Sequence, residues 1–465
     1  MSKKTTNSKS INQKKHNVLL ISIDALRRDY LGCYNSTKKH SKNIDKFAKE
    51  NQIYNGMATA SNTPSSFPGI FYSKYMSDQN GCYTSKNTPS LVENLSNSGY
   101  YTFAFNACNT FISPFFGYGK GFDNFEDYIT NKKEIAKPSM INVGIFKLIT
   151  SKKNYGPFRF VLNIFRDLYR FYSQQIMKRL PFTKAEKLTS DFIDHLDNNV
   201  LKSKKAHRPF FAWIHYMDVH YPFVPFLSDE KYKIEKGSWK RNKIMNLDRV
   251  NKQTVHDLID IYHNSISVVD KQIGRIIKTL KEKNLYDNTI ILIISDHGEE
   301  FLDHNGLDHV AKDYNELLHT PFILKSPFKL KQKHVSLLDL SPTILDFIGS
   351  PIPKTMRGIP LTKKKRKYFF SQTAFYKDLR LFDKLEKQFH KYNESVSNLK
   401  FKLIHNPDTG YKLFNLKNDP KETKDVSKDN LKEFKQLKNE LSKELHSTNQ
   451  KEKAVLSAAI EGIDI

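Results

Sequence analysis

The most constraining feature of the sequence is a set of short apolar runs that end in polar side chains. Residues 289–295 (TIILIIS) are the most apolar of these runs, and Asp296 and His297 follow at once. Residues 17–24 (NVLLISID) form a similar run that ends in Asp24. Continuous runs of this length are typical of parallel strands that are buried on both faces. They predict a sheet whose strand ends carry functional groups.

Two further runs, 101–106 (YTFAFN) and 209–215 (PFFAWIH), have the same character. Segments with helical spacing of apolar residues lie between the predicted strands, at 91–98, 185–199 and 254–283. This alternation predicts an α/β fold with a mainly parallel central sheet flanked by helices.

The chain of 465 residues is long enough for one large domain and a smaller one. From residue 363 onward the sequence changes to short strands, an NPDTG turn and a charged helix near 429–446, which predicts a small C-terminal α+β subdomain. The predicted divisions are a basic tail at 1–16, a main domain at 17–362, the subdomain at 363–450 and a tail at 451–465.

A basic, aromatic and helix-compatible insertion occupies about residues 137–182. It could lie on a membrane surface, giving a peripheral contact, or cap a site. An ordinary helix packed on the body is favoured, because its charges do not segregate to one face.

The formal net charge is +26, which could attract anionic substrates, anionic polymers or lipid headgroups. The lysines are spread along the chain and no nucleic-acid-binding motif is present, so no nucleic-acid partner is predicted. The three cysteines, Cys33, Cys82 and Cys108, have no metal-type spacing and are read as reduced. No run approaches the ~18–20 apolar residues of a transmembrane helix and no secretory signal is found, which predicts a cytoplasmic protein.

Asp24, Asp296 and His297 are the first candidates for a metal site. The carboxyl ends of parallel strands meet at one edge of a sheet, so these residues could converge although they are far apart in sequence. Carboxylates with an imidazole suit a divalent cation such as manganese, zinc, magnesium or calcium. A lone Asp at a strand end is also often a helix N-cap, and that alternative stays open for Asp24.

The opening NVLLISIDALRRDYLGCYN resembles the first strand and metal-binding loop of the sulfatase family. Similar resemblances follow in order along about residues 17–430: PFFAWIHYMDVHYPF, TIILIISDHGEEFLDHNGLDH, NELLHTPFILKSP, SLLDLSPTILDFIGSPIPKTMRGIPL and KLFNLKNDPKETKDVS. The resemblance implies an alkaline-phosphatase-like α/β fold and a metal-dependent hydrolase of sulfate or phosphate esters.

The nucleophile motif departs from the family pattern. Typical sulfatases carry CxPSR, whose Cys becomes formylglycine, about twelve residues before a Tyr. Here Thr63 lies twelve residues before Tyr75, and Phe67 stands where the Arg is expected. A threonine cannot become formylglycine, but in the phosphodiesterase and phospho-headgroup transferase branches of the superfamily a metal-activated Thr attacks directly.

Thr63 is therefore the predicted nucleophile, with Ser66 as the alternative. A third interpretation is that SNTPSSFP only starts a helix, since Pro64 and Pro68 are good helix-start residues.

The resemblance implies that one metal ion is bound by Asp24, Thr63, Asp296 and His297. Calcium-binding sulfatases usually have a second Asp after the first, and Ala25 stands at that position. This difference weakens the case for calcium and favours manganese, zinc or magnesium.

His220, His309 and Lys312 are predicted to face the same site and to stabilise the transferring group or protonate the leaving oxygen. A second metal, bound by Asp218, His220 and His309, is a further hypothesis. Two further histidines are weaker candidates for the site. His304 is predicted equally well to be a functional residue or a solvated loop residue, and His215 is predicted to be a hydrogen-bonded core residue.

Three functional hypotheses follow. The first is a sulfatase-like hydrolase that forms a covalent ester with Thr63. The second is a phosphodiesterase or phospho-headgroup transferase that acts on a lipid or glycan. The third is an inactive member of the family that binds anionic glycan or lipid. The sequence does not identify the natural substrate, the choice between sulfate and phosphate, or the oligomeric state.

Overall fold

The computed structural model describes residues 15–79, 84, 89–129, 182–202, 208–221, 223, 252–309, 311–374 and 392–445. Its centre is an eight-stranded sheet in the order β10-β2-β9-β6-β1-β5-β3-β4. The strands are β1 (Asn17–Ile23), β2 (Gln52–Met57), β3 (Tyr101–Asn106), β4 (Asn124–Glu126), β5 (Phe210–Tyr216), β6 (Thr289–Ile294), β9 (His319–Lys325) and β10 (His334–Ser336).

The four apolar runs form the middle of this sheet. Strand β1 is parallel to both of its neighbours, β5 and β6, and β3 is parallel to β5. Every residue of these four strands is buried, as expected for a sheet covered on both faces. Only β9 interrupts the parallel order, because it runs antiparallel to β6 and β2. The predicted mainly parallel α/β sheet is confirmed.

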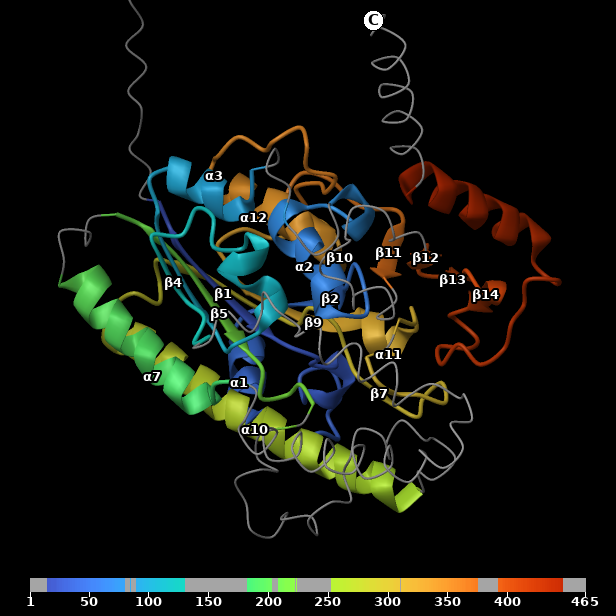
Figure 1. Ribbon diagram of the computed structural model, residues 1–465, viewed down its shortest axis with the longest axis horizontal. Helices are drawn as coiled ribbons and strands as arrows, with labels where there is room; N and C mark the ends of the chain where they lie inside the picture. Colours follow the sequence, from blue (N-terminus) through green and yellow to red (C-terminus); the bar gives the residue numbers. More distant parts are fainter. Residues whose placement is uncertain are drawn as a thin grey trace, which may run out of the picture.

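Helices cover both faces of the sheet (Figure 1). They are α1 (Lys42–Glu50), α2 (Thr63–Tyr72), α3 (Leu91–Asn97), α7 (Ala185–His195), α10 (Lys252–Glu282), α11 (Asn315–Leu318) and α12 (Leu340–Phe347). Leu19 and Ile21 of β1 belong to one apolar core, with side chains of α1, α7 and α10. Val18 and Leu20 point to the other face and join a second core, with α2, α3 and α12. The alternation of side chains along a strand thus supports two cores.

A second sheet follows at the C-terminal end, at the right of Figure 1. It is antiparallel and consists of β11 (Phe369–Ala374), β12 (Tyr392–Ser397), β13 (Phe401–Asn406) and β14 (Gly410–Asn415). The predicted NPDTG turn joins β13 to β14, and Gly410 there has φ +83°, which favours glycine. The helix at 431–445 buries Leu437, Leu441 and Leu445 in the core of this sheet.

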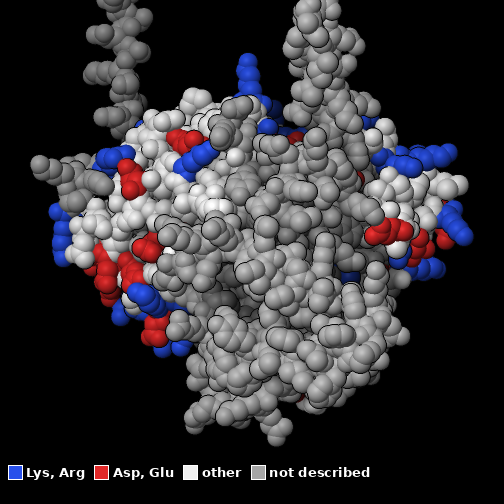
Figure 2. Space-filling model, viewed as in Figure 1, with Lys and Arg blue, Asp and Glu red and all other residues white. Residues whose placement is uncertain are grey.

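The charges on the face seen in Figure 2 are mixed: Lys and Arg side chains lie among Asp and Glu side chains on the described surface. Within the described ranges, no helix is long and apolar enough to cross a membrane. Most of the predicted insertion at 137–182 lies outside the described residues, as do residues 1–14 of the predicted tail at 1–16 and the whole predicted tail at 451–465.

Asp313 provides a test of how the second sheet is attached. Its carboxylate is fully buried and accepts hydrogen bonds from Ser371 Oγ (2.5 Å) and Thr373 Oγ1 (2.9 Å) of β11. Burial raises the pKa of Asp313 to about 6. An Asp in an unfolded chain titrates near ~3.9, so the folded protein holds this proton more tightly.

The free energy of unfolding should therefore fall as the pH rises from about 4 to about 6, and stay lower above that range. Asp313→Asn should remove this part of the pH dependence and raise the melting temperature at neutral pH. Thermal unfolding of both proteins across this range checks it, with Asp408→Asn in the exposed β13–β14 turn as the control. Identical pH profiles for wild type and Asp313→Asn would contradict the raised pKa.

Candidate active site

Polar residues gather where four neighbouring strands end. Asp24 directly follows β1, and Asp296 lies two residues beyond the end of β6. Asn109 and His220 follow the ends of β3 and β5. Because β6, β1, β5 and β3 are adjacent and mutually parallel, these residues meet at one edge of the sheet.

Thr63 reaches this edge as the first residue of α2. The side-chain oxygen of Asn62 accepts a hydrogen bond from Ser65 N (3.1 Å) and caps the helix, while Pro64 occupies its first turn. The Thr63 hydroxyl donates to Asp24 Oδ2 (3.1 Å) and lies 3.2 Å from His297 Nε2. The structure thus brings together the four residues of the predicted metal site.

The two oxygens of Asp24 have different surroundings. Oδ2 accepts hydrogen bonds from Thr63 Oγ1 (3.1 Å), Asn109 Nδ2 (3.0 Å) and His215 Nε2 (3.3 Å). Oδ1 has no hydrogen-bond partner among the described residues, although the side chain is fully buried. One oxygen is thus saturated and the other remains available to a ligand.

Asp296 repeats this arrangement. Its Oδ1 accepts from the backbone N–H groups of His297 (3.1 Å) and Ala25 (3.4 Å), whereas its Oδ2 has no hydrogen-bond partner within the described ranges. The unpaired oxygens of Asp24 and Asp296 each lie 3.5 Å from His297 Nε2.

The hydrogen bond of His297 Nδ1 fixes the tautomer of the ring. Nδ1 lies 2.8 Å from the carbonyl oxygen of Gly298, to which it must donate a proton. In the neutral ring Nε2 then carries a lone pair, and this lone pair faces the two unpaired carboxylate oxygens. Such an outer hydrogen bond is the usual way in which a metal-binding His is oriented. Two buried carboxylate oxygens and an imidazole lone pair within 4.8 Å of one another fit a divalent cation.

The electrostatics of the two acids agree with this fit. Burial and the negative charge of Asp24 raise the pKa of Asp296. Burial acts in the same direction on Asp24, but the imidazoles around it, with His220 the strongest, bring the pKa of Asp24 below its ordinary value. Two buried carboxylates so close together repel each other, and a bound cation would relieve this repulsion.

His215 has a role that the sequence did not reveal. As predicted, it is a buried histidine with its hydrogen bonds satisfied. The Trp213 indole N–H donates to Ser22 Oγ (2.8 Å), and the Ser22 hydroxyl can then donate to His215 Nδ1 (2.9 Å). His215 Nε2 consequently carries the proton directed at Asp24. Asn109 was also missed, and its position just beyond the end of β3 was the only available signal.

His220 and His309 lie near the cluster of Asp24, Asp296 and His297, which is called the Asp24 group from here on. The ring of His309 is 4.6 Å from that of His297 and 4.7 Å from that of His220, measured between centroids. Burial lowers the pKa of His220 to about 4, despite the opposing effect of Asp24. The ligand set proposed for a second metal does not form: in the described part of the chain, neither Asp218 nor His220 belongs to a group with ligand spacing. Asp218 Oδ1 instead accepts from Ala185 N (3.0 Å).

A different second group occurs in the structure. Glu299, Asp308 and His309 each place one ligand atom within 4.8 Å of the others. Of these three residues, only His309 was among the candidates from the sequence; Glu299 lies two residues after His297 and was missed.

Lys312 is not brought to the Asp24 group. Its ammonium donates to both carboxylate oxygens of Glu300 (3.0 and 2.8 Å) and to the carbonyl oxygen of His304 (2.9 Å). Ser66 Oγ likewise donates to the carbonyl oxygen of Asp296 (2.7 Å). Both groups therefore have structural partners already.

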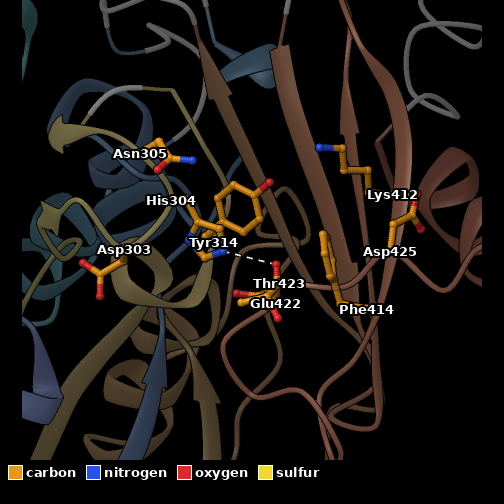
Figure 3. Close-up of a pocket in the computed structure, with 9 residues that line it drawn as sticks. All are labelled: Asp303, His304, Asn305, Tyr314, Lys412, Phe414, Glu422, Thr423 and Asp425. Carbon is orange, nitrogen blue, oxygen red and sulfur yellow. Dashed lines mark hydrogen bonds between the residues drawn. The ribbon is translucent and has the colours of Figure 1, made fainter. Parts of the chain in front are cut away.

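His304 lies in a pocket of about 370 Å³ between the main domain and the second sheet (Figure 3). Its ring stacks on Tyr314, with 3.6 Å between centroids. Its nitrogens face Glu316 Oε1 (2.6 Å) and the carbonyl oxygen of Glu422 (3.2 Å). Both contacts need an N–H donor, and Glu316 raises the pKa of His304 although burial opposes this. His304 thus links its loop to the segment after β14, so of its two interpretations the solvated loop residue does not apply.

Comparison with known proteins shows which family the chain belongs to. A family model described as "Sulfatase" matches residues 16–350, and one described as "N-sulphoglucosamine sulphohydrolase, C-terminal" matches residues 305–451. The uncharacterised sulfatase YidJ of Escherichia coli (strain K12) is 24% identical over 371 residues, which cover 74% of this chain and 70% of that protein. An arylsulfatase of Clostridium perfringens (strain 13 / Type A) is 30% identical over 186 residues, covering 35% of this chain and 38% of the relative.

Two solved structures illustrate the similarity of fold. The phosphonate monoester hydrolase SpPMH from Silicibacter pomeroyi has a TM-score of 0.64 at 20% identity, covering 92% of this chain and 95% of its own. A 2-O GAG sulfatase has a TM-score of 0.62 at 19% identity, with 96% and 92% covered.

The matched residues make up well over half of the chain, which therefore belongs to the sulfatase family. It is a sulfatase-like hydrolase with an α/β main domain and a C-terminal antiparallel subdomain. Enzymes of this family depend on a metal ion, and the structure contains acidic and histidine groups that could hold one.

Gly298 provides a test of how His297 is positioned. A Cβ atom at this residue would lie 1.9 Å from the carbonyl oxygen of Glu316, so only glycine fits. Gly298→Ala should shift the carbonyl group that orients His297. We expect it to cost about 1–3 kcal/mol of stability and to weaken metal binding. Thermal unfolding and the bound metal content measure both effects.

Gly349→Ala is a control for lowered stability without a steric clash, because Gly349 has a positive φ (+68°) and nothing lies within 4 Å of the added Cβ. Gly349→Ala should leave the bound metal content unchanged, and an equal loss of metal in the two variants would show that lowered stability, rather than the contact at Gly298, is responsible.

Proposed function

We propose that this chain is a metal-dependent hydrolase of sulfate or phosphate esters with Thr63 as the nucleophile. The observation that carries the proposal is the position of the Thr63 hydroxyl, 3.1 Å from Asp24 Oδ2 and 3.2 Å from His297 Nε2. It borders a buried group whose two free carboxylate oxygens and imidazole lone pair suit a cation. Among the relatives are enzymes named for sulfate and phosphonate esters, which are substrates of this class.

Asp24, Asp296 and His297 would hold the cation, together with Thr63 Oγ1. When bound, a divalent cation supplies positive charge that lowers the pKa of a nearby hydroxyl and offsets the charge of an anionic ester. Ala25 provides no further ligand, which favours manganese, zinc or magnesium over calcium.

The chain's own residues supply the proton transfers. Thr63 Oγ1 would form a bond to sulfur or phosphorus while the bond to the ester oxygen breaks, and its proton would pass to Asp24 Oδ2, its hydrogen-bond acceptor. His220, an imidazole near Asp24, is assigned to protonate the leaving oxygen; because burial lowers its pKa to about 4, it would take up this proton when the anionic ester binds beside it. Water would then cleave the Thr63 ester, giving one proton to His220, while Thr63 recovers its proton from Asp24.

Two of the other predicted participants have less support. Ser66 is a weaker candidate nucleophile, because its hydroxyl donates to the carbonyl oxygen of Asp296. Lys312 has no part in the scheme, because three oxygen atoms already accept from its ammonium.

The cytoplasmic location stays a prediction.

Turnover of p-nitrophenyl sulfate, phosphate monoester, phosphate diester and phosphonate monoester should be measured with added manganese, zinc, magnesium or calcium. We expect metal-dependent turnover of at least one ester. Thr63→Ala should reduce kcat by at least ~10³-fold, because it removes the group that attacks. Thr63→Ser keeps a hydroxyl and should retain part of the activity, while Ser66→Ala should stay within about tenfold of wild type.

Full activity in Thr63→Ala would move the nucleophile elsewhere, with Ser66 first to be tested. Bound metal without turnover of any ester would favour the alternative of an inactive anion-binding protein. The preferred ester would decide between sulfatase and phosphodiesterase activity.

A further inference from the structure

Glu299 is a buried acid that the proposed reaction does not use. It is 1% exposed, and neither of its carboxylate oxygens has a hydrogen-bond partner among the described residues. Its backbone is fixed, because the carbonyl oxygen accepts from Arg27 Nη1 (3.1 Å). Burying an unpaired carboxylate is costly unless a cation compensates it. Burial raises the pKa of Glu299 to about 7, so the carboxyl group is either protonated or compensated by a bound cation.

The nearest charged neighbours of Glu299 are a histidine and a second acid. His309 Nδ1 lies 3.4 Å from Glu299 Oε1 and 2.8 Å from Asp308 Oδ1. Asp308 has φ +72°, in the left-handed region, and its Oδ1 also accepts from the backbone N–H of His309 (2.8 Å). A residue held in this backbone region is often part of a functional site.

A protonated His309 supplies the charge for only one of these two acids. One imidazolium carries a single positive charge, whereas Glu299 and Asp308 together carry two negative charges when ionised. A divalent cation would balance both acids, and a carboxylate–imidazole set of this kind suits zinc or manganese.

We propose that Glu299, Asp308 and His309 bind a second divalent cation beside the first. The two groups are adjacent, because the rings of His309 and His297 are 4.6 Å apart. Pairs of metal ions about 3.5–4 Å apart occur in many enzymes that cleave phosphate esters. The inference extends the proposed function, since the second ion would lie beside the one that this function requires.

The number of bound ions tests the proposal directly. The full-length chain is stripped with a chelator, dialysed to equilibrium against Zn²⁺ alone or Mn²⁺ alone, and analysed for bound metal. We expect two ions per chain in the wild type and one in Glu299→Gln. His309→Gln is a second variant of the same site, and it should also retain one ion. Asp313→Asn removes a buried carboxylate elsewhere and should retain two.

Thermal unfolding of the metal-free proteins shows whether the variants fold. Glu299→Gln keeps the shape of the side chain and removes a buried carboxylate, so its metal-free form should melt no lower than the wild type. Its gain in melting temperature on adding Zn²⁺ should be smaller than that of the wild type.

One ion per chain in the wild type, or two in folded Glu299→Gln and His309→Gln, would overturn the proposal. Because the count is made without an ester, the two proposals can fail separately. Two ions without turnover of any ester would support the second site and contradict the hydrolase. One ion with turnover would do the reverse.

Discussion

The Asp24 carboxylate is the interaction on which the rest of the site depends. Its Oδ2 accepts from Thr63, Asn109 and His215, which come from the start of α2, the segment after β3 and strand β5. Four parts of the chain that are distant in sequence are thereby fixed relative to one another. The same hydrogen bonds hold the carboxylate so that its other oxygen stays unpaired and close to Asp296 and His297. A pre-organised arrangement of this kind is what a metal-dependent reaction requires.

The parts of the fold that were predicted correctly depend on local sequence. Strands buried on both faces need continuous apolar residues, so β1, β3, β5 and β6 were visible as runs. Parallel neighbours end at a common edge, which is why Asp24 and Asp296 could be expected to meet. Strand β2 (QIYNGM) escaped prediction because it mixes polar and apolar residues and is only half buried. The edge strands β4 and β10, with three residues each, are too short to show a pattern.

The partners of individual side chains could not be predicted in the same way. Lys312 lies in the same segment as several acids, and only the fold shows that Glu300 binds it. His215 faces Ser22 and Asp24 because β5 lies beside β1 in parallel register, with Ser22 opposite His215. A pattern within one strand carries no information on which strand will lie next to it. Glu299 was overlooked for a related reason, because its burial beside Asp308 and His309 is a property of the folded interior.

The backbone at Ala25 shows how this site differs from a calcium site. Ala25 has φ +57°, which is unfavourable for a residue with a Cβ, and Tyr262 holds it by donating to its carbonyl oxygen (2.7 Å). The Ala25 N–H points at Asp296 Oδ1 (3.4 Å). Where calcium-binding sulfatases usually have a second carboxylate, this chain has the methyl side chain of Ala25, which offers no oxygen ligand. Calcium prefers six to eight oxygen ligands, whereas zinc is usually four-coordinate and accepts imidazole readily. The proposed ligands, His297 with Asp24, Asp296 and Thr63, are therefore the reason why the proposed function favours manganese, zinc or magnesium over calcium.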